Sequence, residues 1–315
     1  MSILGGVRRR WRLGVPFVVA AIGVFELLAH YRFANAAPDI EAWQAVRPLI
    51  QGIAAPSDLI LISPHWAEPN ARSVLGAGLM PLENVARADE SRFSRAIEIS
   101  ILGESAEELA GWKLDREERA GAFEIRTWSN PHVQTVLYDF LTNAEPEHLS
   151  VSVERGGKPL EACAYATNQR VTNGDLGGHP TFPKQRFSCP GPEWAFVGRT
   201  VIEDQNYRPR QCLWAHPIGR AVLSLRYAAV PIGSVIHGYG GLPFLIERES
   251  RGSPIELSAV IAGEVVGTFR HTDGEGWKSF ELSTERFRGQ TLPVEFRVRS
   301  KRDARREFCF QADVR

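Results

Sequence analysis

Between residues 41 and 128, hydrophobic positions recur at intervals that alternate between helical and strand-like. The short apolar run 59–62, bounded by a turn and a proline, is typical of a buried strand. Ser105 with Glu108 three positions later has the form of a capping box at the start of a helix. The predicted elements are, in order, a helix over 41–52, strands over 59–62 and 93–102, a helix over 105–119 and a strand over 123–128. This order predicts a small α/β domain over residues 37–140.

After residue 131 the hydrophobic pattern changes to short, closely spaced strands separated by Gly and Pro. Val294, Phe296 and Val298 alternate with charged residues, so one face of their sheet meets water. A hairpin turn is predicted at Ala262, Gly263 and Glu264. The predicted strands are 149–154, 194–203, 221–228, 234–237, 242–247, 255–261, 264–270, 279–283, 292–300 and 307–312. Such regular spacing predicts a β-sandwich of jelly-roll type over residues 149–315.

The first 36 residues have the layout of an export signal or a membrane anchor. Four arginines, the last of them Arg12, precede an apolar run over residues 13–29 that is broken only by Glu26. Basic residues ahead of a first hydrophobic segment stay in the cytoplasm, so the rest of the chain is expected outside it. The small residues 34–36 also suit cleavage after Ala36. An uncleaved inner-membrane anchor is the favoured reading, and a secreted protein is the alternative.

The predicted fold class is therefore α+β with two domains: a small α/β domain followed by an all-β jelly-roll sandwich, behind an N-terminal hydrophobic helix. A chain of 315 residues with 43% hydrophobic residues is long enough for two such cores. Its 37 basic and 37 acidic residues cancel. Without a net positive field, nucleic acid is not expected as a partner.

Four cysteines, an even number, indicate disulfides in an oxidising compartment. Three pairings are possible, and the favoured one joins Cys163 to Cys189 and Cys212 to Cys309. Spacing does not suit structural zinc, because no two cysteines lie two to four residues apart. The first pair would close a segment, residues 165–188, that has no clear element and is rich in Gly, Pro and Asn. Loops of that length are usually functional or disordered, and a disulfide argues against disorder.

The C-terminal half resembles jelly-roll sandwiches of the galactose-binding-domain-like type, which include many carbohydrate-binding modules. The likeness covers about residues 150–315 and lies in the strand rhythm, the Gly276-Trp277 turn and the closing strand around Cys309. It implies a fold and a ligand site among the loops at one end of the sandwich, although no ligand residue can be matched singly.

Residues 41–130 are similar, more loosely, to the small extracytoplasmic α/β module of some membrane glycosyltransferases. Residues 60–66, a strand that leads into a Pro-x-Trp-type loop, carry that likeness. The chain has no further hydrophobic spans in which such enzymes act. The likeness therefore implies a place near surface-glycan machinery and no transferase activity.

Common catalytic and cofactor fingerprints are absent, so no cofactor and no metal are predicted. The loop after strand 59–62 is the best site candidate of the first domain, because ligands tend to bind at the carboxyl ends of α/β strands. In it His65 could act as a base, Glu68 could orient it, and Trp66 could bind a ligand. A proline-stiffened loop whose Trp covers the core is the plainer interpretation.

In the second domain the loop over residues 270–277 combines hydrogen-bonding groups with an aromatic ring, which suits a sugar. Its candidate residues are His271, Asp273, Glu275 and Trp277, and His237 with Tyr239 are expected at the same end. A plain turn with a packed Trp fits equally. The basic run 301–306 is most simply a solvated loop, and contact with an anionic glycan or lipid headgroup is the sharper alternative.

These features predict a membrane-anchored extracytoplasmic binding or accessory protein that recognises carbohydrate or assists surface-polysaccharide machinery. An extracytoplasmic enzyme acting on glycans is one alternative. A structural subunit of a membrane protein complex, with a membrane-protein partner, is the other.

Overall fold

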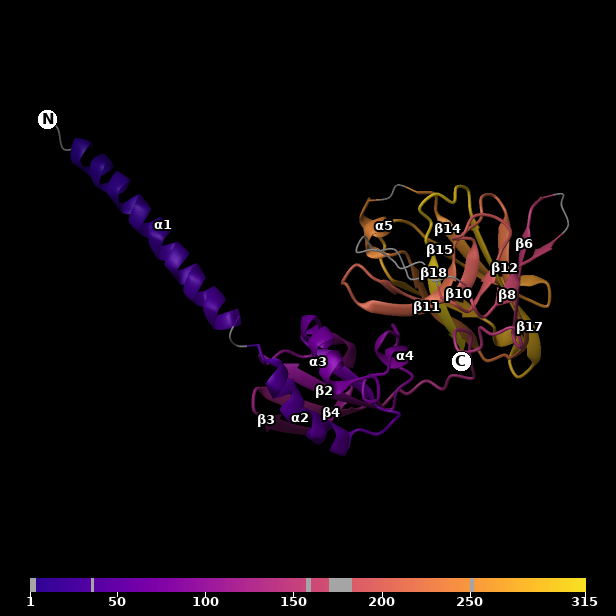
Figure 1. The fold of residues 1–315 in the computed structure, drawn as a ribbon, viewed down its shortest axis with the longest axis horizontal. Helices are drawn as coiled ribbons and strands as arrows, with labels where there is room; N and C mark the ends of the chain where they lie inside the picture. The colour runs from indigo at the N-terminus through magenta and orange to yellow at the C-terminus, as the bar shows by residue number, and fades with distance from the viewer. Residues whose placement is uncertain (1–3, 35–36, 157–159, 170–182, 250–251) are drawn as a thin grey trace. The chain divides into compact units, whose positions relative to one another are not determined.

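The computed structural model describes residues 4–34, 37–156, 160–169, 183–249 and 252–315, and the chain divides into two compact units (Figure 1). Unit 1 comprises Met1–Pro81 and Ser94–Pro131, and unit 2 comprises Leu82–Phe93 and His132–Arg315. Residues 82–93 thus belong to unit 2, although their neighbours on both sides in the sequence belong to unit 1. The domain boundaries expected from the sequence, 37–140 and 149–315, did not assign residues 82–93 to the second domain.

Unit 1 begins with the long helix α1 (Leu4–Ala34), which carries large exposed apolar side chains such as Phe17 and Phe25. Among the helices that the structure describes, none combines the length and the apolar character needed to cross a membrane. The helix α2 (Ile40–Ile53) begins at Asp39, whose carboxylate accepts a hydrogen bond of 2.8 Å from the backbone N–H of Ala42.

The sheet of unit 1 has the strand order β1-β2-β4-β3, and only its first pair is parallel. Its strands are β1 (Leu59–Ser63), β2 (Arg95–Ile101), β3 (Lys113–Ala120) and β4 (Phe123–Ser129). The short helices are η1 (His65–Ala67), α3 (Glu68–Leu75) and η2 (Glu107–Leu109). The predictions of the helix at 41–52 and of the strands at 59–62, 93–102 and 123–128 are confirmed.

The helix predicted over residues 105–119 is wrong. The chain there forms one turn, η2, and then the edge strand β3, which is exposed along most of its length. Gly111 has a φ of 86°, which ends helical conformation, and β3 turns back onto β4 through Gly121, which has a φ of 62°. Pairing with β4 therefore overrides the helix propensity of the Glu, Arg and Leu residues in this segment.

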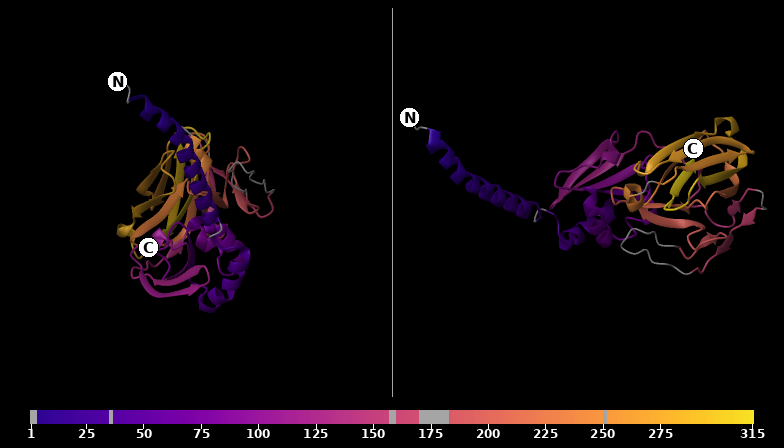
Figure 2. Two further views of the ribbon diagram at one scale, coloured as in Figure 1. Left: turned by 90° about the vertical axis from the view of Figure 1, so that its left-hand side faces the viewer. Right: turned by 90° about the horizontal axis from the view of Figure 1, so that it is seen from above.

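Unit 2 is a sandwich of two antiparallel sheets, as the sequence predicts (Figures 1 and 2). One sheet has the order β16-β13-β18-β11-β10-β9-β8 with β5 paired to β18, and the other has the order β15-β14-β17-β12-β6-β7. The strands are β5 (Tyr138–Asp139), β6 (Leu149–Glu154), β7 (Glu161–Ala162), β8 (Ala164–Ala166), β9 (Arg186–Ser188), β10 (Phe196–Glu203), β11 (Pro209–Ala215), β12 (Val222–Pro231), β13 (Val235–Gly241), β14 (Ile255–Ile261), β15 (Glu264–His271), β16 (Lys278–Ser283), β17 (Thr291–Ser300) and β18 (Cys309–Val314). Unit 2 also contains the short helices η3 (Glu285–Phe287) and α4 (Leu82–Val85).

The main core of unit 2 lies between the two sheets. Alternate residues of each strand enter it, for example Leu213 of β11, Phe296 of β17 and Phe310 of β18, and all three are fully buried. Burying a side chain of this size contributes about 2 kcal/mol relative to leaving it in water. The hairpin turn predicted at residues 262–264 is confirmed, but it is one residue shorter: Ala262 and Gly263 have positive φ, whereas Glu264 already pairs with Ile261.

A second apolar cluster covers the outer face of the larger sheet. The Cys212–Cys309 disulfide lies in it with Phe196, Ile202 and Trp214, and Trp277 packs against it. The disulfide joins β11 to β18, which are neighbouring strands. Both disulfides favoured by the sequence are confirmed, whereas strand β11 itself was not predicted.

The strand predicted over residues 242–247 is also wrong, because the helix α5 (Phe244–Glu249) occupies this place. Pro243 precedes the helix, where its missing N–H costs nothing. The carboxylate of Glu247 then accepts a hydrogen bond of 3.1 Å from the backbone N–H of Leu242, just before the helix begins. The short apolar run alone did not distinguish a strand from a helical turn.

Candidate functional site

A pocket of about 350 Å³ opens at the edge of the larger sheet of unit 2, where β8 and β9 join β10. We call it the stapled pocket, because the Cys163–Cys189 disulfide closes the two strands that form one wall. Its size falls within the range of about 300–1,000 Å³ that is usual for small-ligand sites. The lining residues are Ala144, Glu145, Tyr165, Thr167, Pro183, Lys184, Gln185, Arg186, Phe187, Val197, Gly198 and Arg199.

Strand register places several lining residues of the stapled pocket in one row. Tyr165 of β8 lies opposite Phe187 of β9, which in turn lies opposite Val197 of β10. The rings of Tyr165 and Phe187 are 4.8 Å apart, centroid to centroid. Because side chains two positions apart in a strand share a face, Arg199 continues beyond Val197 on the same side. The pocket therefore has an aromatic floor beside hydrogen-bonding groups.

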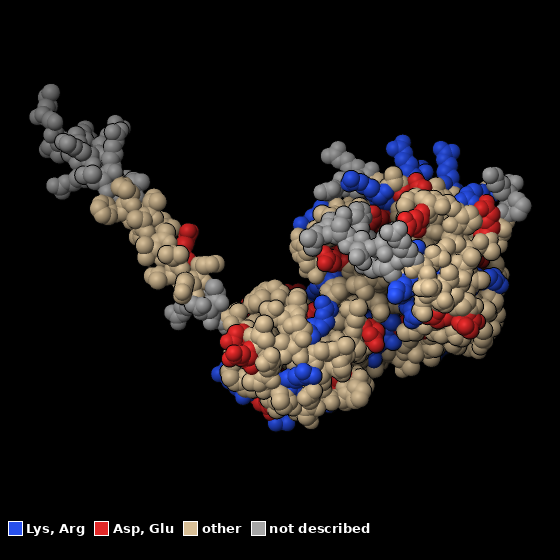
Figure 3. Space-filling view, viewed as in Figure 1, with Lys and Arg blue, Asp and Glu red and all other residues tan. Residues whose placement is uncertain are grey.

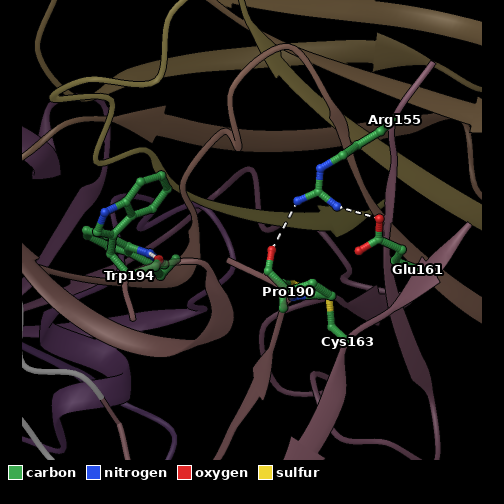
Figure 4. Close-up of a disulfide and its surroundings, with 7 residues drawn as sticks. Arg155, Glu161, Cys163, Pro190 and Trp194 are labelled. Atoms are coloured by element: carbon green, nitrogen blue, oxygen red, sulfur yellow. Dashed lines mark hydrogen bonds and ion pairs between the residues drawn. A yellow bond between two sulfur atoms is a disulfide. The ribbon is translucent and has the colours of Figure 1, made fainter. Parts of the chain in front are cut away.

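The disulfide holds these edge strands where few backbone partners exist. Cys163 and Cys189 flank the β8–β9 pair, and Arg155 bridges the same region (Figure 4). The guanidinium of Arg155 donates a hydrogen bond of 3.1 Å to the carbonyl of Pro190 and pairs with Glu161 at 2.8 Å. The wall of the stapled pocket is therefore fixed by a covalent bond and an ion pair as well as by the sheet.

Gly198 allows the wall to approach strand β10. A Cβ atom at this position would lie 3.0 Å from the Cβ of Arg186 and 3.0 Å from the Cγ of Pro183. Real Cβ contacts are rarely so close, so a larger residue would push the segment around Pro183 outward and change the shape of the pocket.

Glu145 is the central polar group of the stapled pocket. One carboxylate oxygen accepts a hydrogen bond of 2.6 Å from the hydroxyl of Tyr165, and the other pairs with the guanidinium of Arg199. Burial raises the pKa of Tyr165 to about 12, and the hydrogen bond to Glu145 adds to this rise. The phenol therefore stays protonated, while Glu145 and Arg199, whose side chains are 30% and 39% exposed, remain open to a ligand.

The loop over residues 270–277, which the sequence singles out, is held by internal contacts. His271 is fully buried, and its Nε2 lies 2.6 Å from a carboxylate oxygen of the buried Glu247. The second oxygen of Glu247 accepts a hydrogen bond of 2.7 Å from the N–H of Gly274. His271 therefore fixes the loop from beneath and is not accessible to a ligand.

The other candidates in this loop are also engaged within the fold. Asp273 pairs with Arg306 and accepts a hydrogen bond of 2.6 Å from the N–H of Gly252. Glu275 accepts a hydrogen bond from the N–H of Thr272 and pairs with Lys278 at 3.1 Å. Trp277 is half-buried against the second apolar cluster. A sugar-binding role for this loop stays a prediction. The contacts of these side chains within the fold explain their presence without a ligand.

His237 and Tyr239 lie on β13, beside Asp313 and Gln311 of β18, to which they are paired in register. Burial lowers the pKa of His237, and the positive charge of Arg315 lowers it further. Gln311 is buried, and neither atom of its amide has a hydrogen-bond partner among the described residues. The cavity there is about 10 Å³, enough for about one water molecule.

The same place brings Asp89, His237 and Asp313 together, with potential metal-ligating atoms within 4.8 Å of one another. Arg315 already occupies both carboxylates: its Nε lies 2.6 Å from Asp313, and its Nη2 bonds Asp89. Burial raises the pKa of Asp89, but Arg315 and Ser91 outweigh this, and the pKa lies below its usual range. Because a metal ion would be repelled by the guanidinium, these residues do not fit a metal site.

In unit 1 the candidate residues lie at the start of the short helices that follow β1. The Nε2 of His65 lies 3.0 Å from a carboxylate oxygen of Glu108, so Glu108 orients this imidazole, and Glu68 pairs with Arg72 at 3.4 Å. Trp66 is 58% exposed. Glu108 is thus an orienting carboxylate for His65 that the sequence did not indicate, and a ligand role for this loop stays a prediction.

No residue of the stapled pocket was singled out from the sequence. The available signal was the segment 165–188 between two cysteines, which contains part of the lining and was expected to be functional or disordered. The partners Glu145 and Arg199 lie outside this segment in the sequence, and the folded chain brings them to it.

The chain matches no family model and no curated protein. Similar solved structures include a carbohydrate-binding module, CBM51 of Clostridium perfringens GH95 in complex with methyl-galactose, at 10% identity and a TM-score of 0.28, with 46% of this chain and 93% of that chain covered. The CBM51-2 and INT domains of Clostridium perfringens ZmpB, in complex with GlcNAc, match at 7% identity and a TM-score of 0.29, with 65% of this chain and 41% of that chain covered. At these scores the likeness alone identifies neither a ligand nor a family. The sandwich architecture rests on the sheets themselves.

Proposed function

We propose that the protein binds carbohydrate and that the stapled pocket of unit 2 is the binding site. The observation that carries this proposal is the arrangement of Tyr165, Glu145 and Arg199 in the lining of the pocket, where a carboxylate and a guanidinium lie beside an aromatic ring. Planar charged groups of this kind donate or accept hydrogen bonds in pairs, as neighbouring hydroxyls of a sugar require. The ring offers an apolar face to the C–H side of the same sugar.

Binding is favoured over hydrolysis by the number of carboxylates in the pocket. Glycosidases of the usual kind use two carboxyl groups, one on each side of the scissile bond. Among the described residues that line the stapled pocket, Glu145 is the only carboxylate, and Arg199 and Tyr165 already hold its charge. This supports a binding or accessory role at this site.

Two finer parts of the expected function remain proposals. Attachment to the inner membrane through α1 would cover its exposed apolar side chains, among them Phe17 and Phe25. A place beside surface-polysaccharide machinery rests on the loose likeness of residues 41–130 to glycosyltransferase modules, which stays unconfirmed.

The proposal is tested by Glu145→Gln, which keeps the shape of the side chain and removes its charge. Full-length protein and the variant are compared on a glycan array, and the affinity for the best glycan is then measured by calorimetry. A hydrogen bond to a charged group contributes about 1.5–3 kcal/mol, so we expect affinity to fall about tenfold or more. Because the side chain is partly exposed, the melting temperature should change little.

Glu285→Gln is the matched control, since its carboxylate is 60% exposed and lies outside the pocket. It should leave glycan affinity unchanged. Wild-type protein that is folded and binds no glycan on the array would remove the proposal, as would equal losses in the two variants.

A further inference from the structure

Unit 2 also has a strongly basic groove, distinct from the stapled pocket. Its volume is about 640 Å³, and it lies where β14 begins and where β15 and β17 end. We call it the basic groove, and its lining residues are Arg220, Pro254, Glu256, Arg270, Arg299, Ser300, Lys301 and Arg302. Figure 3 shows Lys and Arg side chains standing along the edge of unit 2 where β14 and β15 are labelled in Figure 1.

Strand register aligns the central residues of the basic groove. Glu256 of β14 lies opposite Arg270 of β15 on one side and opposite Arg299 of β17 on the other. All three side chains are exposed, whereas the neighbouring Ile255 and Leu257 point into the core. Since adjacent strands are about 4.8 Å apart, the two arginines emerge about 10 Å from each other across the strand that carries Glu256.

The cations of the basic groove are not neutralised by the protein. In the part of the chain that the structure describes, no carboxylate oxygen lies within 4.0 Å of a side-chain nitrogen of Arg220, Arg270, Arg299, Lys301 or Arg302. Five positive charges and one carboxylate give the lining a formal charge of 5 − 1 = +4. Elsewhere on the same sheet Arg297 pairs with Glu295 at 2.8 Å. Like charges gathered without counter-charges attract an anion.

Nearby acidic residues are used for other contacts, which leaves these cations free. The carboxylate of Asp303 accepts a hydrogen bond of 2.8 Å from the N–H of Gly219, next to Arg220. Asp273 is bound to the fully buried Arg306. The two loops that carry Arg220 and Lys301 are thereby joined to each other and anchored from below. Their basic side chains project from a fixed backbone, so little order is lost when an anion binds.

We propose that the basic groove binds an anionic polysaccharide, a chain of sugars that bears carboxylate, sulfate or phosphate groups. Guanidinium groups form paired, charge-assisted hydrogen bonds with such anions. Glu256, between the two arginines, accepts hydrogen bonds from sugar hydroxyls, which alternate with the anionic groups along the chain. A close-packed layer of lipid phosphates would instead meet this carboxylate as a like charge, and a membrane surface is flat where this site is concave.

This inference extends the proposed carbohydrate binding to a second site and depends on different residues. The experiments can therefore contradict one of the two proposed sites without contradicting the other. Glu145→Gln, which tests the stapled pocket, should leave binding at the basic groove within about twofold of wild type, because the two sites share no lining residue.

The test compares dextran sulfate with uncharged dextran, since the two probes share a backbone and differ in charge. The full-length protein, purified in a mild non-ionic detergent, is titrated with each at low and at high salt. We expect binding to dextran sulfate alone, weakened by salt. The double variant Arg270→Gln, Arg299→Gln should bind at least about tenfold more weakly, because it loses two charge-assisted contacts.

The control is Arg286→Gln with Arg288→Gln, which removes the same net charge from exposed positions outside the groove. It should change affinity less than about twofold. The loop variant Lys301→Gln, Arg302→Gln leaves the strands untouched, and a loss of about tenfold is expected there as well, even if the strand variant proves unstable. Equal losses in groove and control variants, equal binding to both probes, or no binding by folded wild-type protein would each overturn the proposal.

Phosphatidylglycerol vesicles form the last arm, with phosphatidylcholine vesicles as the neutral reference. The full-length protein with the apolar run 13–29 exchanged for a polar linker is used here, so that this segment cannot insert. Vesicle binding that the groove variants abolish, without binding to dextran sulfate, would identify a membrane-surface site and overturn the polysaccharide proposal. Binding to dextran sulfate without vesicle binding supports it.

Discussion

At the residue scale, exposure separates the polar groups that stabilise this protein from those available to a ligand. Glu98 of β2 is fully buried and accepts hydrogen bonds from the hydroxyl of Ser63, the N–H of Ala106 and the indole of Trp128. His271 and Glu247 form a comparable buried pair. Glu145 has partners too, yet it faces an open pocket. Residue type was readable from the sequence, but exposure depends on strand pairing and was not.

His216 makes the stability of unit 2 depend on pH. Burial lowers its pKa from the usual 6.5 to about 4, so the folded protein binds this proton less readily than the unfolded chain. The contribution of neutral, buried His216 to the free energy of unfolding is therefore fully present above about pH 6.5, and it is lost as the pH falls toward 4. A shift of this size corresponds to about 3 kcal/mol in the free energy of unfolding.

We expect His216→Gln to flatten the loss of stability between pH 7 and pH 4, as measured by urea unfolding at each pH. The exposed His132 gives the comparison, since His132→Gln should leave the slope unchanged. If the slope of the His216 variant equals that of wild type, other groups whose pKa is lowered in the folded protein, such as Asp89 and Asp139, must account for the acid sensitivity.

At the element scale, strands with strong alternation were predictable and segments of mixed preference were not. The strand at 292–300 and the hairpin turn at 262–264 followed from the hydrophobic pattern, and both disulfides belong to the pairing that was favoured among the three possible ones. Residues 113–120 carry charges in a helix-favouring mixture, and only their pairing with β4 makes them a strand. The strand β11 begins with Pro209 and contains Arg210 and Gln211, which weakened its apolar signal.

The disulfide at β8 and β9 gives a prediction that separates stability from binding. Its cysteines are 26 positions apart, so replacing both with Ser should cost roughly 3.5 kcal/mol through the loss of loop closure. Because the edge strand β8 and its neighbour β9 form the wall of the stapled pocket, glycan affinity should fall even where the variant is folded. Urea unfolding and calorimetry on the same sample measure the two effects.

Replacing Cys212 and Cys309 with Ser is the counterpart. Their separation of 97 positions predicts a larger loss of stability, roughly 4.7 kcal/mol. Their bond lies between inner strands of the sheet, away from the pocket lining, so the folded fraction should keep its glycan affinity. Unchanged binding in the first variant would mean that the sheet alone holds the pocket wall.

At the scale of the whole molecule, a chain with no net charge still concentrates positive charge in one groove. The 37 basic and 37 acidic residues cancel in total, while the lining of the basic groove carries an excess of cations. Composition excluded a general attraction to polyanions, and it could not exclude a local one. The basic run at 301–306 indicated the groove only in part, because Arg220, Arg270 and Arg299 reach it from three other places in the sequence.

The N-terminal segment gives a prediction for the whole chain in the cell. If residues 13–29 hold the protein in the inner membrane, full-length protein should sediment with membranes and resist extraction with alkaline carbonate, because its apolar side chains are buried in lipid. Deletion of residues 1–36 should release it. Soluble protein whose first residue is Ala37, found by N-terminal sequencing, would instead establish a cleaved export signal.

The assignment of residues 82–93 to unit 2 determines how this protein can be divided into recombinant fragments. Arg87 of this segment pairs with Asp139 at 2.8 Å, and Asp89 bonds Arg315. A recombinant fragment that starts at residue 132 would keep buried Asp139 and lose this cation. Neither unit is a continuous stretch of sequence, so a single cut of the chain would not separate the two.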